Sequence, residues 1–240
     1  MPGVEKPVDK VDKHKPAQDL RFCGPVLAVV AKQPVAGKVK TRLTPRLHPR
    51  QARALCRVAL QESLVRFAAG PAALVLCCAG RRAWFARVFP GMPLLPQGRG
   101  GLGARRARVT TALFAAGAGP VAVAGADTPD LPLPMIGAAF AALDSADVAV
   151  IACRDGGYAL LALRRPAPGL FAGIPWSTAE VLAATRQRAA ELGLRLATVG
   201  EWEDLDDPAA LHRLVLRSPA CLTAQYARAH LGSLLPSGCG

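Results

Sequence analysis

The amino-acid sequence predicts an α/β protein, folded as a three-layer α/β/α sandwich around a mostly parallel β-sheet. Short, continuously apolar runs alternate along the chain with longer segments of helical spacing, which is the pattern of parallel strands joined by helices. Hydrophobic residues make up 51% of the 240 residues, so one large domain can bury its core without disulfide or metal support. We therefore expect a single domain over residues 24–217.

The first half of the chain begins with a charged, proline-containing segment, residues 1–22, which we expect to be a disordered arm. A buried strand is predicted at 25–31, and the loop that follows it, residues 32–48, is rich in cations. The elements expected next are a helix at 49–69, a strand at 72–79, a helix at 82–88, a Pro/Gly-rich stretch at 90–103 and a helix at 104–116.

The second half continues the alternation, and several of its helices have recognisable starts. Ser177 and Glu180 have the spacing of a capping box before a helix at 178–192, and Asp207 followed by Pro208 predicts another helix start. Asp130 is expected to cap the helix that follows it. The residues after Ser218 are expected to form a weakly structured tail. The remaining predicted elements are a strand at 120–125, a helix at 133–143, and strands at 147–152, 158–164 and 194–199.

Composition and charge exclude several classes of protein. The longest uncharged, largely apolar run, residues 70–80, is too short to cross a membrane. Seven cysteines without C-x-x-C spacing predict reduced thiols and a cytoplasmic protein. The net charge is +13, with cations concentrated at 32–53 and 81–108 and most acids after Ala126. Such a division suits a site that binds a polyphosphate through a divalent cation, although a basic surface that binds nucleic acid would give a similar distribution.

The loop after the first predicted strand carries the clearest binding signal, because ligands of parallel sheets bind beyond the carboxyl ends of strands. Gly37 permits a tight turn, and three nearby cations, Lys38, Lys40 and Arg42, can contact successive phosphates. The segment is not a P-loop, since Val39 stands where Ser or Thr is needed. A solvated basic loop is the alternative.

Three acidic loops offer candidate ligands and hydroxyl acceptors. Asp127 follows the most apolar strand and is predicted to bind Mg²⁺, with an Asx-turn as the alternative. Asp155-Gly156-Gly157 forms either a plain hairpin turn or a site where bare backbone approaches a sugar or acceptor. The run Glu203-Asp204-Leu205-Asp206-Asp207 offers a second carboxylate for the metal, or a merely solvated loop.

One motif points to a different chemistry. Gly98-Arg99-Gly100-Gly101-Leu102-Gly103 matches the G-x-G-x-x-G fingerprint of NAD(P)-binding oxidoreductases and precedes a predicted helix. The strand before it would contain Pro93 and Pro96, which are poorly tolerated in a central strand. We therefore keep dinucleotide binding only as a lesser alternative.

Six short motifs together resemble a known family. They occur in order between residues 26 and 215: AKQPVAGKVKTRL, LPQGRGGLG, GADTPDLP, RDGGYALLAL, GIPWST and DLDDPAAL. They are similar to the glycosyltransferase-like family related to 2-phospholactate guanylyltransferase, often filed as a domain of unknown function. The resemblance implies a nucleotide-diphospho-sugar transferase fold of the GT-A type, with a nucleotide and Mg²⁺ or Mn²⁺ at the carboxyl edge of the sheet.

The resemblance also implies roles for individual residues. Asp127 and, by a looser match, Asp206 would bind the metal, and Asp127, Lys40 and Asp155 would be catalytic. Acceptor or sugar binding would fall to Asp155, Gly156, Gly157 and Trp176. The nucleotide would contact Lys32, Gly37, Lys38, Lys40, Thr41, Arg42, Gln97 and Gly98.

The sequence departs from the family at three acidic positions. Gly101 and Ala104 stand where the family has an acid and a glutamate, and Arg154 stands where it has a glutamate. We predict an Mg²⁺-dependent transferase that uses a nucleoside triphosphate or nucleotide sugar and a small acceptor, by glycosyl or nucleotidyl transfer. A catalytically silent nucleotide- or nucleic-acid-binding protein is the alternative, and we expect no nucleic-acid partner for the enzyme.

Overall fold

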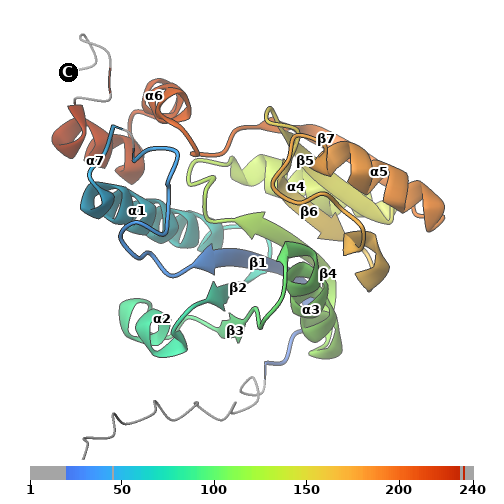
Figure 1. Cartoon of the computed structure of the whole chain (residues 1–240). Coiled ribbons are helices and arrows are strands. Elements are labelled where there is room, and N and C mark those ends of the chain that lie inside the picture. The colour runs from blue at the N-terminus through green and yellow to red at the C-terminus, as the bar shows by residue number, and fades with distance from the viewer. Residues whose placement is uncertain (1–19, 45, 233–234, 236–240) are drawn as a thin grey trace, which may run out of the picture.

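The computed structural model describes residues 20–44, 46–232 and 235, and contains one seven-stranded sheet with helices on both faces (Figure 1). The expected arm at 1–22 lies almost wholly outside the described residues. The strand order is β3-β2-β1-β4-β6-β5-β7, and only β6 runs antiparallel to its neighbours. The predicted α/β sandwich with a mostly parallel sheet is confirmed. The strands are β1 (Gly24–Lys32), β2 (Ala73–Ala79), β3 (Leu94–Pro96), β4 (Ala118–Gly125), β5 (Val148–Cys153), β6 (Tyr158–Leu163) and β7 (Leu196–Trp202).

Helices cover the two faces of the sheet in separate apolar layers. Alternate residues of β1 point to opposite faces, so that Leu27 and Val29 join one layer while Val26 and Ala28 join the other. The first layer also contains side chains of α1, α2 and α4, and the second contains those of α3 and α5. The helices of these two layers are α1 (Pro49–Ala68), α2 (Arg82–Val88), α4 (Leu133–Ala141), α3 (Leu102–Ala115) and α5 (Val181–Glu191), with short 3-10 turns η1 (Ala142–Asp144) and η2 (Pro168–Phe171).

The chain ends in two helices that pack outside α1. They are α6 (Pro208–Arg217) and α7 (Leu222–His230), and with α1 they enclose a separate apolar cluster (Figure 1). The buried carboxylate of Glu62 on α1 accepts hydrogen bonds from the backbone N–H groups of Leu222 and Thr223, each at 2.9 Å. This contact satisfies donors at the start of α7. The expectation of a weakly structured tail after Ser218 is therefore wrong for residues 222–230.

Two helix starts also differ from the prediction, whereas a third is confirmed. Asp130 does not cap α4; it is buried and accepts hydrogen bonds from Trp202, Arg217 and Ser218. Ser177 does not cap α5, which begins at Val181; the Leu182 N–H in its first turn donates to the Gly156 carbonyl. Asp207 does cap α6, since its side chain accepts from the Ala210 N–H at 2.7 Å.

Candidate functional site

The candidate site is a cavity of about 330 Å³ at the carboxyl edge of the sheet. Strands β1 and β4 are neighbours in register, with Val30 paired to Gly125, so the loops that follow them emerge side by side. The cavity lies between these two loops, and helix α1 closes one side of it. Its lining residues are Val30, Ala31, Lys32, Lys38, Val39, Lys40, Thr41, Arg42, Cys56, Leu60, Ala126, Asp127 and Asp206.

Buried leucines hold the cation-rich loop in place, and the cations of this loop line the cavity. Leu43 and Leu47 are almost completely buried against α1, α6 and α7. The backbone turns at Gly37 (φ +75°) and Lys40 (φ +49°), two residues in the left-handed region. Glycine adopts this conformation readily, whereas for lysine it costs free energy. Such strain in a non-glycine residue is typical of functional sites.

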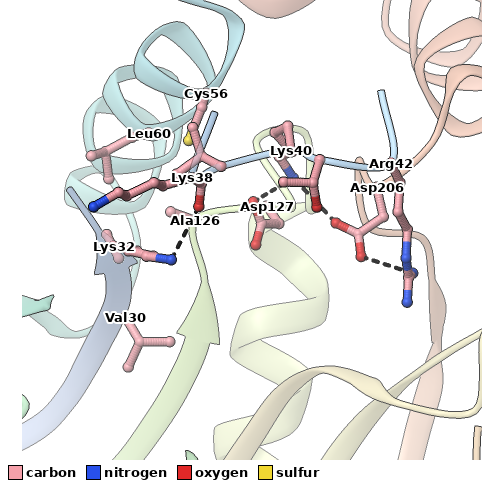
Figure 2. A pocket seen from close by; sticks show the side chains of 13 residues that line it. Val30, Lys32, Lys38, Lys40, Arg42, Cys56, Leu60, Ala126, Asp127 and Asp206 are labelled. Carbon is pink, nitrogen blue, oxygen red and sulfur yellow. Dashed lines mark hydrogen bonds and ion pairs between the residues drawn. The ribbon is translucent and has the colours of Figure 1, made fainter. Parts of the chain in front are cut away.

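Lys40 is the most enclosed cation of the site, with only 4% of its side chain exposed. Its ammonium lies 2.5 Å from Asp127 Oδ1 and 3.3 Å from Asp206 Oδ1 (Figure 2). It also donates to the Leu205 carbonyl. Its three N–H donors therefore have three acceptors. Burial alone would lower the pKa of Lys40, but the carboxylates of Asp127 and Asp206 outweigh it and raise the pKa above its usual value.

The other cations of the loop are more exposed and only loosely held. Arg42 is 64% exposed and lies 3.4 Å from Asp206 Oδ2. Lys32 donates to the Lys38 carbonyl at 3.0 Å, and the Lys38 ammonium points away from this contact (Figure 2). Lys32, Lys38 and Arg42 can therefore reorient toward an anionic ligand at little cost, since exposed ion pairs contribute little to stability.

Asp127 faces the cavity, as its predicted role requires. Its side chain is half exposed, and its ion pair is with Lys40, with no Asx-turn among the described contacts. Asp206, on the loop after β7, lies within reach of the same ammonium. The backbone N–H of Leu205 donates to the Asp127 carbonyl at 2.8 Å, which ties the two acidic loops together. Both carboxylates thus already converge on one cation.

A second cavity of about 300 Å³ adjoins the first and shares Arg42 and Asp206 with it. Asp155 lies on the turn of the β5–β6 hairpin, where its Oδ1 accepts from the Gly157 N–H at 2.9 Å. The hydrogen bond of Asp155 Oδ1 is that of a plain hairpin turn, one of the two alternatives predicted for this segment. Asp155 also lines the second cavity. The other lining residues are Arg154, Glu203, Asp204, Asp207, Ala210 and Arg213.

Asp204 belongs to the acidic run predicted to offer a second carboxylate for the metal, although Asp206 was the residue selected from that run. Burial, together with the charges of Asp206, Asp155 and Asp127, raises the pKa of Asp204 to about 7. Ligand atoms of Cys153, Asp155 and Asp204 all lie within 4.8 Å of one another. The signal for Asp204 was its position: β5 pairs with β7, so the residues that follow both strands meet at one edge.

Several predicted residues lie outside both sets of cavity-lining residues and make packing contacts. Gln97 is buried, and its amide donates to the carbonyls of Cys77 and Ala31. Gly98 packs against the Arg108 side chain, and Trp176 lies under the Arg106 guanidinium at 4.7 Å. A side chain at Gly156 would collide with the Ala179 carbonyl.

The geometry of the glycine-rich segment is unlike that of a dinucleotide site. The strand before it, β3, has three residues and lies at the edge of the sheet, whereas the dinucleotide motif follows a central strand. A Cβ at Gly103 would stand 2.4 Å from the Phe171 carbonyl oxygen and 2.6 Å from Trp176 Nε1. Gly103 therefore permits close packing of α3 against the 171–176 segment.

Comparisons with known proteins agree with this architecture. The model of the family described as "Uncharacterized protein conserved in bacteria (DUF2064)" matches residues 62–178. A crystal structure from Desulfovibrio desulfuricans G20, provisionally named a nucleotide-diphospho-sugar transferase, superposes with a TM-score of 0.80 and 27% sequence identity, over 88% of this chain and 96% of that one. The fold is that of the nucleotide-diphospho-sugar transferases. The resemblance predicted from the six motifs is thereby confirmed.

More distant structures share the fold alone. CMP:2-keto-3-deoxy-manno-octonic acid synthetase, solved with CTP, has a TM-score of 0.52 and 13% identity over 81% of this chain and 98% of that one. The inositol-1-phosphate CTP transferase from T. maritima has a TM-score of 0.50 and 15% identity over 84% and 96%. No curated protein sequence is significantly similar to the chain. None of the helices described is long and apolar enough to span a membrane.

Proposed function

We propose that the protein is a divalent-metal-dependent transferase that uses a nucleotide donor. The observation that carries this proposal is the cavity lined by Lys32, Lys38, Lys40 and Arg42 together with Asp127 and Asp206, at the carboxyl edge of β1 and β4. Cations on one wall suit the phosphates of a donor, and paired carboxylates on the other suit a metal shared with those phosphates. The similarity to a provisionally named nucleotide-diphospho-sugar transferase supports this reading.

The donor would place its phosphates against the cation-rich loop. Lys32, Lys38 and Arg42 would neutralise the charge of the diphosphate or triphosphate, and Thr41 offers a hydroxyl on the same wall. As the bond to the leaving phosphate breaks, negative charge develops there, and pre-positioned cations stabilise it. Gly37 would allow the backbone to approach the phosphates closely.

The residues present fit a divalent metal. Asp127 and Asp206 come from different loops, yet both carboxylates contact one cationic group, the Lys40 ammonium, which stands in for a metal ion. Carboxylate oxygens are the ligands that Mg²⁺ and Mn²⁺ prefer. When bound, the metal would polarise the phosphoryl oxygens of the donor and neutralise their charge.

The acceptor would occupy the second cavity, beside the donor's reactive end. Asp155 lines this cavity and has one carboxylate oxygen that is not used by the turn, so it can accept a hydrogen bond from an acceptor hydroxyl. Both nucleotidyl transfer from a nucleoside triphosphate to a small phosphorylated acceptor and glycosyl transfer from a nucleotide sugar fit this arrangement. The reduced thiols favour a cytoplasmic enzyme.

Ligand-dependent stabilisation tests the donor class. A ligand that binds the native state raises its melting temperature, so nucleoside triphosphates and nucleotide sugars are each screened with Mg²⁺, with Mn²⁺ and with a chelator. We expect a rise that requires both a nucleotide and a metal, followed by release of pyrophosphate or a nucleoside diphosphate once an acceptor is added. No stabilisation by any nucleotide under any of these conditions would contradict the proposal.

A second candidate is a catalytically silent nucleotide- or nucleic-acid-binding protein. The observation in its favour is the replacement of three acids of the family pattern by Gly101, Ala104 and Arg154. Arg154 lines the second cavity and pairs with Glu201. Nucleotide binding without product formation would support it, and binding of an oligonucleotide that weakens steeply with salt would identify the nucleic-acid form.

A further inference from the structure

Lys40 contacts the carboxylates proposed as metal ligands and is enclosed among them. It comes from the loop after β1, whereas Asp127 and Asp206 come from the loops after β4 and β7. The Lys40 side chain is 4% exposed, and the three donors of its ammonium are satisfied by the two carboxylates and the Leu205 carbonyl. Figure 2 shows Lys40 between the two carboxylates, with Arg42 on the far side of Asp206.

A count of carboxylate oxygens shows how little room is left for a second cation. Asp127 Oδ1 and Asp206 Oδ1 both contact Lys40, and Asp206 Oδ2 contacts Arg42. Among the described contacts, only Asp127 Oδ2 has no ion pair. A metal that bridges the two carboxylates must therefore take at least one oxygen from Lys40 or Arg42. A metal and an ammonium on one carboxylate oxygen would also repel each other strongly in this partly buried setting.

The carboxylates do not depend on Lys40 to stay together. The Leu205 N–H donates to the Asp127 carbonyl, so a backbone hydrogen bond joins the two acidic loops. Lys40 itself adopts a left-handed backbone, which is unfavourable for lysine and is offset by its three contacts. The side chain can thus leave while both carboxylates remain.

We propose that Lys40 and the divalent metal are alternative partners of Asp127 and Asp206, and that the donor's phosphates exchange one for the other. The inference rests on the proposed metal and nucleotide site. Phosphates bound by Lys32, Lys38 and Arg42 offer the Lys40 ammonium new acceptors, and its departure frees the carboxylates for the metal. Metal binding to the protein alone is therefore weak, and nucleotide and metal bind together by linkage.

The test measures Mn²⁺ binding to the nucleotide-free protein from the electron paramagnetic resonance signal of free Mn²⁺. Lys40→Gln keeps much of the length of the side chain and can still donate to Leu205, but it removes the competing charge. Lys38→Gln is the matched control, because it removes one cation from the same loop without touching either carboxylate. Lys40→Met serves as a second variant, and thermal melting establishes that each protein is folded.

We expect Mn²⁺ to bind Lys40→Gln or Lys40→Met at least fivefold more tightly than it binds wild type, with Lys38→Gln less affected. Adding Asp127→Asn to Lys40→Gln should abolish the gain. A smaller gain in both Lys40 variants, an equal gain in Lys38→Gln, or a gain that survives Asp127→Asn would overturn the inference. Nucleotide binding by wild type is measured separately, so its absence would contradict the proposed function, while the Mn²⁺ comparison still decides whether Lys40 and the metal compete for the two carboxylates.

Discussion

Asp204 should make the folded state less stable as the pH rises, and replacing it should remove this effect. Its pKa is raised from 3.8 to about 7 by burial and by the charges of Asp206, Asp155 and Asp127. The folded protein therefore holds a proton on Asp204 in a range where the unfolded chain has lost it. The contribution of Asp204 to the unfolding free energy is therefore most favourable below about pH 4, and it falls between about pH 4 and pH 7.

The structure sets an upper limit on the size of the effect. A difference of about three pH units between the two pKa values corresponds to about 4 kcal/mol of unfolding free energy. The interval from pH 5 to pH 8 covers about two of these three units, or at most about 2.7 kcal/mol. Asp204 is partly exposed and coupled to neighbouring acids, so we expect about 1–2 kcal/mol over this interval after solvent screening. For a chain of this size, the melting temperature of the wild type should fall by about 2–8 °C more than that of the variant between pH 5 and pH 8.

Thermal melting of wild type and Asp204→Asn at pH 5 and pH 8, in a chelator, measures this difference directly. Asp144→Asn is the control, since Asp144 is an exposed aspartate on η1. If Asp204→Asn and wild type lose the same stability between the two pH values, the argument for a charged cluster at Asp204 is refuted.

Two further predictions concern the nucleotide cavity and the glycine-rich segment. Lys38→Glu and Arg42→Glu should each weaken nucleotide binding at least tenfold by calorimetry, with little change in melting temperature because both cations are exposed. Lys40→Glu should also destabilise the fold, because it adds a third carboxylate beside Asp127 and Asp206. Unchanged affinity in Lys38→Glu and Arg42→Glu would show that the phosphates bind elsewhere. Gly103→Ala should lower the unfolding free energy by about 1–3 kcal/mol, because its methyl group would meet the Phe171 carbonyl and Trp176. Wild type should show no calorimetric signal with NAD or NADP. A dissociation constant in the low micromolar range for either cofactor would restore the prediction of a dinucleotide site.

The fold could be predicted from sequence because its signals are local. Most buried strands of the sheet are short apolar runs, and the helices between them have clear spacing, so most elements were predictable to within a few residues. The exceptions are the three-residue edge strand β3, which lies in the Pro/Gly-rich stretch, and α7, which lies in the expected tail. The helix starts at Ser177 and Asp130 were wrong for tertiary reasons. Asp130 instead binds Trp202 and Arg217, which come from distant elements, and the first turn of α5 donates a backbone hydrogen bond to Gly156 on the β5–β6 turn.

The site could be predicted only in part. Because ligands bind beyond the carboxyl ends of parallel strands, the positions of Lys40 and Asp127 after two apolar runs are enough to predict that their loops share one edge of the sheet. The direct contacts of Lys40 with Asp127 and Asp206 could not be foreseen, because they join residues up to 166 positions apart. Gln97 and Trp176 belong to the family motifs. Their contacts with the Cys77 carbonyl and the Arg106 guanidinium join distant parts of the chain and could not be foreseen from sequence alone.

Nucleotide titration of wild type and Asp127→Asn, each with Mg²⁺ and with a chelator, tests most directly whether the cavity binds a nucleotide through a metal. The substitution keeps the size of the side chain but removes the charge that would hold the metal beside the phosphates. We predict that Mg²⁺ strengthens nucleotide binding at least tenfold in wild type and in Asp144→Asn, and less than twofold in Asp127→Asn. Equal enhancement by Mg²⁺ in wild type and Asp127→Asn would contradict the assignment of Asp127 and, with it, the proposed transferase site.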